Sequence, residues 1–220
     1  MSTVIPISII SDAICPWCYV GYSSLQRAIQ AVKQRHADYS FDISWQAFEL
    51  HPEYPATMPV LSKKQMYKEK FGDSPRFAMM QEYLSQRASA VGAKIAPLND
   101  SMVVGSTKLV HEAEVFAKNK GKQTELMLAF FDAYFTHGGN IFEREKIVKI
   151  AEGIEGLDAK ELDEYLQARR GEKEVAAESA KNRFIGGVPH FTIGFGAGAI
   201  EVHGGQAPEE FEKVLTSLIE

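Results

Sequence analysis

Cys15 and Cys18 are the only cysteines of the chain, and Pro16 and Trp17 separate them. An apolar, β-branched segment precedes this Cys-Pro-Trp-Cys motif, and a helical pattern starts at Pro16. A cysteine at a helix N-terminus lies near unpaired backbone N–H groups and the positive end of the helix dipole, which favours its thiolate form. We therefore expect Cys15 to be the attacking thiol. Cys18, one turn further along the same helix face, is expected to stay protonated and to act as the resolving thiol.

Two other uses of a Cys-x-x-Cys pair explain the sequence less well. A zinc site needs four ligands, and the six histidines are scattered without the spacing of metal ligands. Two buried structural cysteines would leave the Pro16 and Trp17 between them unexplained. The pattern thus predicts a catalytic dithiol and no metal site.

The composition restricts the partners of this dithiol. The chain has 220 residues, of which 45% are hydrophobic and 24% are charged, as in ordinary globular proteins. Its formal net charge of −5 gives no attraction for nucleic acid or for acidic membrane surfaces, so we expect neither as a partner. The N-terminal residues do not resemble a secretory signal, which predicts a cytoplasmic protein, where lone cysteine pairs are usually catalytic. No oligomeric state is predicted.

The elements around the motif form a βαβ unit. Residues Val4 to Ile10 read as a strand, which Pro6 places at a sheet edge or at a strand start. Apolar residues then recur at helical spacing from Pro16 to about His36. An alternating pattern from Phe41 to Phe48 predicts a second strand. Three prolines follow before residue 60 and indicate a boundary.

A different pattern occupies the middle of the chain. From Ser62 to about Ile185 every strong pattern is helical; one segment opens at Ser74-Pro75 and is closed by Gly92. Two short strands, near Val188–Gly194 and Ala199–Val202, and a helix from about Pro208 to Ile219 follow. We therefore predict an α/β sheet domain from residues 1–60 plus 185–220, with an all-helical insertion at 61–184.

An aromatic face lies within this helical region. It is interpreted mainly as packing between helices, with a share in a substrate groove beside Cys15 as the alternative. Its residues are Phe130, Phe131, Tyr134 and Phe135.

The order of these features resembles a known family. A strand, the Cys-Pro-Trp-Cys motif, a long helix, a helical insertion and Gly187-Val188-Pro189 before a strand resemble the DsbA-like branch of the thioredoxin superfamily. More narrowly, the sequence is similar to the FrnE-like dithiol-disulfide isomerases. The residues that carry this second likeness are Asp12 to Gly21, Gly105 to Ala117 around His111, Ala133-Tyr134-Phe135, Asn140-Ile141 and Gly204-Gly205-Gln206.

The resemblance implies a thioredoxin-like fold and several site residues. Pro189 would be a cis proline facing the Cys15 sulfur, and the Val188 backbone would pair with a bound substrate. Trp17 is expected to be exposed, and with Pro16 it would adjoin the substrate. His190 stands where the family usually has threonine, so its ring lies either near the thiols or on a solvent-facing strand position.

The function expected from these features is that of a thiol-disulfide oxidoreductase or isomerase that forms a mixed disulfide with its substrate. The substrate would be a disulfide-containing protein or a small thiol compound. No cofactor is expected, apart from glutathione as a possible reductant. The alternative is a glutathione-dependent transferase or isomerase, similar to the kappa class and the chromene-carboxylate isomerases. A third possibility is a binding module that holds ligands without catalysis.

Overall fold

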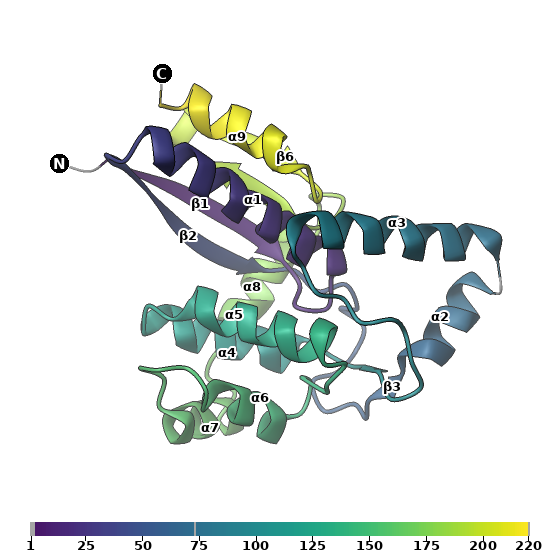
Figure 1. The fold of residues 1–220 in the computed structure, drawn as a ribbon. Coiled ribbons are helices and arrows are strands. Elements are labelled where there is room, and N and C mark those ends of the chain that lie inside the picture. The colour runs from purple at the N-terminus through teal and green to yellow at the C-terminus, as the bar shows by residue number, and fades with distance from the viewer. Residues whose placement is uncertain (1–2, 73, 220) are drawn as a thin grey trace.

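The computed structural model of the protein describes residues 3–72 and 74–219 and contains a four-stranded mixed sheet (Figure 1). The strands lie in the order β2-β1-β5-β6. β1 pairs in parallel with β2, whereas β5 is antiparallel to both β1 and β6. Their bounds are β1 (Thr3–Ser11), β2 (Tyr39–Ala47), β5 (His190–Ile193) and β6 (Ile200–His203), with the short 3-10 turn η2 (Gly196–Gly198) between the last two.

Pro6 lies inside β1, a central strand, so our prediction of an edge strand or a strand start is wrong. β1 pairs with β2 along its whole length, but its pairing with β5 starts only at Ile7. Pro6 therefore precedes the residues that pair with β5, where a missing N–H is tolerated. Its carbonyl still accepts a hydrogen bond from Gly194 N–H over 3.0 Å.

Two helices lie side by side on one face of the sheet: α1 (Pro16–Arg35) and α9 (Pro208–Ser217) (Figure 1). The apolar stripe predicted for the first helix is buried, because Leu25 and Val32 have no exposed surface. Phe191 of β5 packs edge-on against Phe211 of α9, with ring centroids 4.8 Å apart. The long helix that starts at the cysteine motif is thus fixed against the sheet by apolar burial.

The chain between β2 and β5 is mainly helical. Its helices are α2 (Lys63–Phe71), α3 (Pro75–Val91), α4 (Lys108–Asn119), α5 (Gln123–Phe131) with the π-helical turn η1 (Asp132–Thr136), α6 (Arg144–Ala151), α7 (Ala159–Gln167) and α8 (Glu172–Asn182). Helices α4, α5 and α8 contact β2, while α3 contacts α1 and projects with α2 to one side (Figure 1). A two-residue pairing between β3 (Leu61–Ser62) and β4 (Val103–Val104), which the sequence patterns did not predict, also lies here.

The boundaries of α3 agree with the prediction from the sequence. Ser74 Oγ accepts a hydrogen bond from Phe77 N–H over 3.3 Å, and Pro75 follows as the first helical residue. Gly92 ends the helix in the left-handed conformation with φ of 79°. Local capping chemistry therefore fixes where this helix begins and ends.

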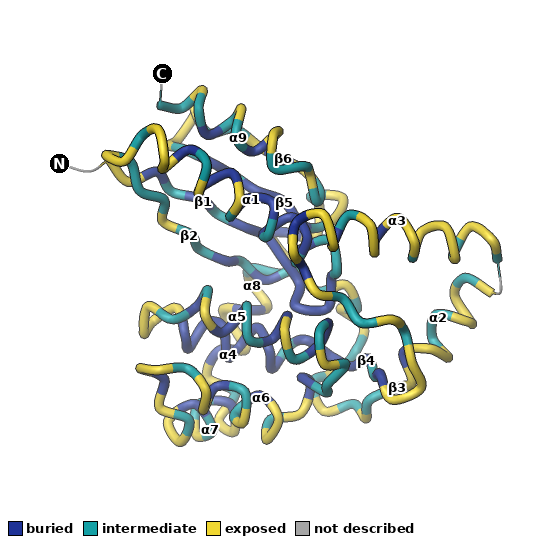
Figure 2. The backbone as a smooth tube through the Cα atoms, viewed as in Figure 1, coloured by how far each residue is buried: buried dark blue, intermediate teal, exposed yellow. Residues whose placement is uncertain are grey.

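The predicted aromatic face lies mostly in the core. Phe130 and Phe131 have no exposed surface, and Tyr134 and Phe135 are only 2% exposed. Tyr19 of α1 stacks on Phe131 and Phe135, with centroid distances of 5.1 and 6.0 Å. Figure 2 shows burial concentrated on β1 and β5, whereas much of α3 is exposed. None of the described helices combines the length and apolar character that crossing a membrane requires.

Candidate active site

Cys15 is the N-cap residue of α1, which is where the sequence places it. Strand β1 ends at Ser11, and a tight turn brings Cys15 N–H to 3.0 Å from the carbonyl oxygen of Asp12. Cys15 has extended φ and ψ angles of −85° and 111°, and Pro16 is the first helical residue. The Cys15 carbonyl accepts hydrogen bonds from Cys18 N–H at 3.0 Å and Tyr19 N–H at 3.4 Å. Cys15 therefore stands at a helix start with unpaired N–H groups, although its side chain accepts no capping hydrogen bond from them.

Both cysteines are reduced and buried, but their environments differ. Cys15 is 5% exposed, whereas Cys18 has no exposed surface. Burial, and then the neighbouring Cys15 thiol, raise the pKa of Cys18 well above its ordinary value. Cys18 therefore stays protonated until its environment changes, as expected of a thiol that reacts second.

The Cys15 thiol faces the strand that follows the helical region. Val188–Pro189 is a cis peptide bond, as the family resemblance implied. Cys15 Sγ donates a hydrogen bond to the Val188 carbonyl oxygen over 3.6 Å. The Pro189 carbonyl in turn accepts from Gly204 N–H at 2.8 Å. This places the backbone of the loop next to the sulfur.

Helix α1 approaches this loop so closely that two glycines are required. A Cβ on Gly21 would lie 3.0 Å from both Pro189 Cγ and Phe191 Cζ, and a Cβ on Gly205 would lie 3.1 Å from Trp17 Cε3. Both distances are shorter than ordinary van der Waals contacts. Absence of side chains here lets the start of α1 pack directly against Pro189.

Trp17 is half-buried rather than exposed, so that expectation is wrong. Its ring lies 5.7 Å from the ring of Tyr83 on α3, and Gly205 covers another part of it. Pro16 is also half-buried. The two residues between the cysteines therefore face α3 and a cavity described below, instead of open solvent.

His190 does not occupy a solvent-facing strand position, because it is only 5% exposed. Its Nδ1 lies 3.0 Å from Nδ1 of His203 on β6, which is directly opposite in the sheet. Burial, with a contribution from His203, lowers the pKa of His190. Among the described residues, no interaction of this ring with either thiol is found.

A buried polar network lies directly behind the cysteine turn, and sequence reasoning did not assemble it. The carboxylate of Asp12 accepts hydrogen bonds from Leu50 N–H at 2.8 Å, Ile14 N–H at 3.3 Å and Thr107 Oγ1 at 3.4 Å. His111 Nε2 lies 3.8 Å from the same carboxylate. The network thus joins the turn before Cys15 to the loop after β2 and to the start of α4.

His111 is the charged centre of this network. Its Nδ1 lies 3.3 Å from Glu114 Oε2, and its Nε2 lies 3.0 Å from the Phe48 carbonyl oxygen. Burial acts to lower the pKa of His111, but Glu114 and then Asp12 outweigh it and raise the pKa to about 9. The imidazolium form therefore compensates the buried carboxylates. The sequence signals for this cluster were the segments around Asp12 and His111 that carry the family likeness, and neither segment indicated that the two residues meet.

Comparison with known proteins identifies the family to which this chain belongs. The sequence profile of the DSBA-like thioredoxin domain matches residues 6–216, nearly the whole chain. The chain belongs to the DsbA-like thioredoxin family. It is also 27% identical to protein YwbO of Bacillus subtilis over 215 residues, which cover 96% of this chain and 95% of that protein.

Solved structures of DsbA-like proteins have the same fold. A probable DsbA oxidoreductase from Streptomyces coelicolor superposes with a TM-score of 0.83 at 30% identity, covering 98% of this chain and 90% of that one. The cytosolic disulfide reductase DsbM from Pseudomonas aeruginosa superposes with a TM-score of 0.65 at 18% identity, covering 97% and 98%. The similarity to the Streptomyces coelicolor protein extends to the amino-acid sequence, whereas the similarity to DsbM is one of fold.

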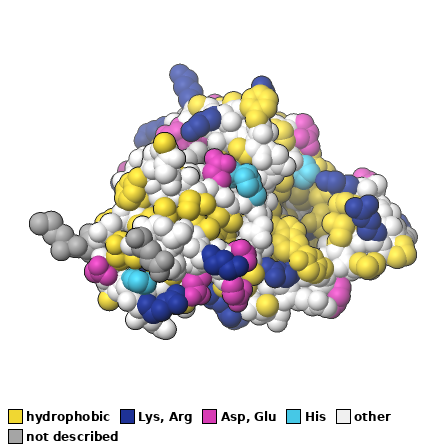
Figure 3. Space-filling model, turned by 90° about the horizontal axis from the view of Figure 1, so that it is seen from above, with side chains coloured by type: hydrophobic (Ala, Val, Ile, Leu, Met, Phe, Trp, Pro, Cys, Tyr) yellow, Lys and Arg dark blue, Asp and Glu magenta, His cyan; other side chains and the backbone are white. Residues whose placement is uncertain are grey.

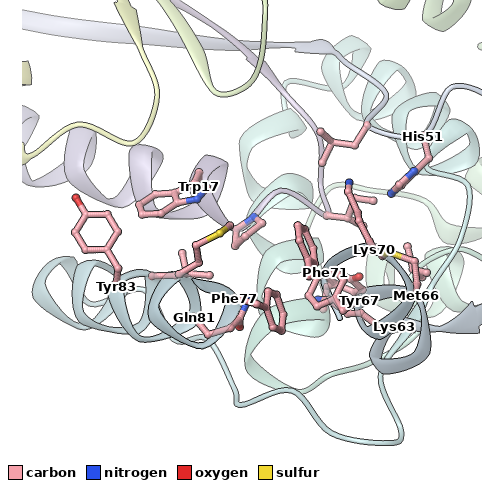
Figure 4. Close-up of a pocket in the computed structure, with 17 residues that line it drawn as sticks. Trp17, His51, Lys63, Met66, Tyr67, Lys70, Phe71, Phe77, Gln81 and Tyr83 are labelled. Carbon is pink, nitrogen blue, oxygen red and sulfur yellow. The ribbon is translucent and has the colours of Figure 1, made fainter. Parts of the chain in front are cut away.

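A cavity of about 240 Å³ adjoins the cysteine motif of this DsbA-like chain (Figure 4). Both neighbours of Cys15, Ile14 and Pro16, line it, as does Trp17. Helices α2 and α3 supply most of the other walls. Figure 3 shows a hollow lined by hydrophobic side chains on the side from which these helices project, with Lys or Arg side chains at its edge. A molecule bound there would lie beside the dithiol.

Proposed function

We propose that this protein is a cytosolic thiol-disulfide oxidoreductase that works through the Cys15–Cys18 dithiol. One observation carries the proposal. The Cys15 sulfur, at the start of α1, faces the Val188 backbone before a cis proline, with the protonated Cys18 one turn behind it. Membership of the DsbA-like family supports the same reaction class.

The proposed reaction starts with attack of the Cys15 thiolate on one sulfur of a substrate disulfide. The substrate S–S bond breaks, one substrate thiolate leaves and takes up a proton, and a mixed disulfide with Cys15 forms. Cys18 then loses its proton and attacks Cys15 Sγ, which releases the second substrate thiol and closes the Cys15–Cys18 disulfide. Two electrons pass from the dithiol to the substrate. A mixed disulfide that rearranges within the substrate before Cys18 attacks gives isomerisation instead.

The oxidised enzyme must be reduced again to turn over. Two equivalents of glutathione or another small thiol would supply the two electrons, one thiol attacking the Cys15–Cys18 bond and the second releasing the first as a disulfide. The proposed location is the cytosol, which keeps thiols reduced. Such an environment favours the reductase and isomerase directions of the reaction.

Replacement of each cysteine by serine tests this function. With insulin as substrate and glutathione as reductant, wild-type protein should reduce the insulin disulfides. Pre-reduced Cys18→Ser, mixed with insulin in the absence of glutathione, should instead accumulate a covalent complex, visible by intact mass spectrometry and removed by dithiothreitol. Cys15→Ser, the matched control, should form no complex and show no reduction.

The same variants distinguish the proposal from a glutathione-dependent transferase or isomerase, which needs one nucleophile only. Undiminished turnover by Cys18→Ser, with no trapped complex, would contradict the dithiol mechanism and favour that alternative. Insulin reduction by Cys15→Ser would exclude Cys15 as the attacking residue.

A further inference from the structure

Lys63 is a buried cation in the wall of the cavity beside the cysteine motif. It is the first residue of α2 and is 8% exposed. Its Nζ lies 4.3 Å from the ring centroid of Tyr134 and 5.8 Å from that of Tyr67. Among the residues that the structure describes, no carboxylate forms an ion pair with it. A buried ammonium group without an anionic partner is costly, and aromatic rings compensate only part of its lost hydration.

The charge of Lys63 persists at neutral pH. Burial lowers the pKa of Lys63 to about 8, so the ammonium form still predominates at pH 7. An anion that enters the cavity would therefore meet a cation that has already lost most of its water. A charge-assisted hydrogen bond formed under these conditions is stronger than one at the surface.

Aromatic side chains form a large part of the remaining cavity wall, which also contains aliphatic residues and a second, exposed cation, Lys70. Phe71 and Phe77 stack with centroids 4.9 Å apart, and Tyr67 meets Phe77 edge-on at 5.5 Å. All three line the cavity, and Figure 4 shows Lys63 with Tyr67 toward one end and Trp17 with Tyr83 toward the other. A flat, apolar ring is the group that packs best against such a surface.

The size of the cavity limits what it holds. Sites for drug-sized ligands measure about 300–1,000 Å³, and this cavity measures about 240 Å³. It therefore accommodates one small ring system. Because Ile14 and Pro16 line the cavity, the end of an occupant that contacts them would lie next to Cys15.

We propose that this cavity selects small aromatic disulfides that carry a carboxylate, with the carboxylate paired to Lys63 and the ring packed on Tyr67, Phe71 and Phe77. The proposal rests on the function proposed above and names a substrate class for the same site. One half of the disulfide occupies the cavity, and one of its sulfurs is attacked by Cys15. Cys18 then closes the enzyme disulfide, so that each substrate molecule is reduced to two thiols by one dithiol.

Single-turnover kinetics with two aromatic disulfides test the selection. Pre-reduced protein is mixed with 5,5′-dithiobis(2-nitrobenzoate), which has carboxylates, or with 4,4′-dithiodipyridine, which has none, and thiol release is followed by absorbance. Lys63→Met should lower the second-order rate constant for the carboxylated disulfide by about tenfold or more, since hydrogen bonds to charged groups contribute about 1.5–3 kcal/mol. The rate constant for the uncharged disulfide should stay within about twofold.

Lys64→Met is the matched control, because Lys64 is the next residue, is exposed and pairs with Asp100 at 2.8 Å. It removes the same charge and should change neither rate constant. Lys63→Arg, which keeps the charge, should retain most of the preference for the carboxylated disulfide. An equal loss on both disulfides in Lys63→Met, or an equal loss in Lys64→Met, would overturn the proposal.

A binding measurement separates this proposal from the dithiol function. Calorimetry with 2-naphthoate and its uncharged amide needs no reaction at Cys15. Wild-type protein should bind 2-naphthoate more tightly than the amide, and Lys63→Met should lose the difference. If reduction fails in wild-type protein but this binding pattern holds, the redox function is wrong and the anion site stands. Equal binding of both probes would overturn the site itself.

Discussion

At the scale of single residues, the charge of His111 is determined by its buried neighbours. Its ring contacts Glu114 and the Phe48 carbonyl and lies near Asp12, with no exposed side-chain surface. Because these acceptors raise the pKa of His111 to about 9, the folded protein holds a proton that an unfolded chain releases near pH 6.5. The stabilisation is complete below pH 6.5 and is lost as the pH rises through about 9.

Chemical denaturation between pH 6 and pH 10 should reveal this linkage. A pKa difference of this size corresponds to on the order of 3 kcal/mol, so the free energy of unfolding of wild-type protein, measured relative to His111→Gln, should fall by roughly that amount over the range. The lowered pKa of Lys63 acts in the opposite direction above pH 8, but it does so in both proteins. His111→Gln should lose the contribution of His111 to this dependence, because no imidazole remains to titrate at that position. His137→Gln, which changes an exposed histidine, is the control and should keep the wild-type slope. Parallel slopes for wild-type protein and His111→Gln would contradict the assignment.

At the scale of elements, the position of α1 relative to the Pro189 loop depends on close backbone packing. Gly21 faces Pro189 and Phe191, and Gly205 faces Trp17, in each case without room for a methyl group. The start of α1 carries Cys15, so any displacement of the helix from the loop would also move the sulfur relative to Val188. Stability and reactivity should therefore change together at these positions.

Gly21→Ala is expected to destabilise the fold by about 1–3 kcal/mol, the usual cost of overpacking in a filled core. It should also slow thiol release in single-turnover measurements, because Pro189 must shift to admit the methyl group. Gly198→Ala serves as the control, since a Cβ there meets nothing within 4 Å. Urea denaturation and stopped-flow absorbance check both effects. Unchanged stability and rate in Gly21→Ala would refute the packing argument.

At the scale of the whole molecule, α3 joins the helical region to the sheet-forming part through a small, separate apolar cluster. Val20 of α1 is fully buried there against Leu84, Ala88 and Val91 of α3. The opposite side of α3 is exposed, as the 73% exposure of Met79 shows. Since α3 also lines the cavity, this cluster positions the cavity wall relative to the dithiol.

Leu84→Ala should therefore cost about 2 kcal/mol or more of folding stability, because it removes buried methyl groups from the cluster. Met79→Ala, on the exposed side of the same helix, should stay within about 0.5 kcal/mol of wild type. Urea denaturation followed by circular dichroism measures both. Equal effects of the two substitutions would mean that α3 is not held by this cluster.

Local signals in the sequence predicted the elements that carry the dithiol. Pro16 after Cys15 indicated the helix start, and Ser74-Pro75 with Gly92 indicated both ends of α3, since capping acts within one turn. The prediction that Pro6 marks an edge strand or a strand start was wrong, because the effect of its missing N–H depends on which neighbouring strand pairs with β1 at that position. The two-residue strands β3 and β4 carried too short a pattern to be recognised.

The sequence by itself determined the spacing of Cys15 and Cys18, their position at a helix start and the order of strands and helices around them. Only the tertiary structure decided what surrounds the thiols. Cys15 meets the Val188 carbonyl from 173 residues away, Asp12 meets Thr107 and His111, and Lys63 meets Tyr134. Such contacts arise when apolar faces distant in sequence pack together and exclude water, and propensities within one helical turn carry no information about them.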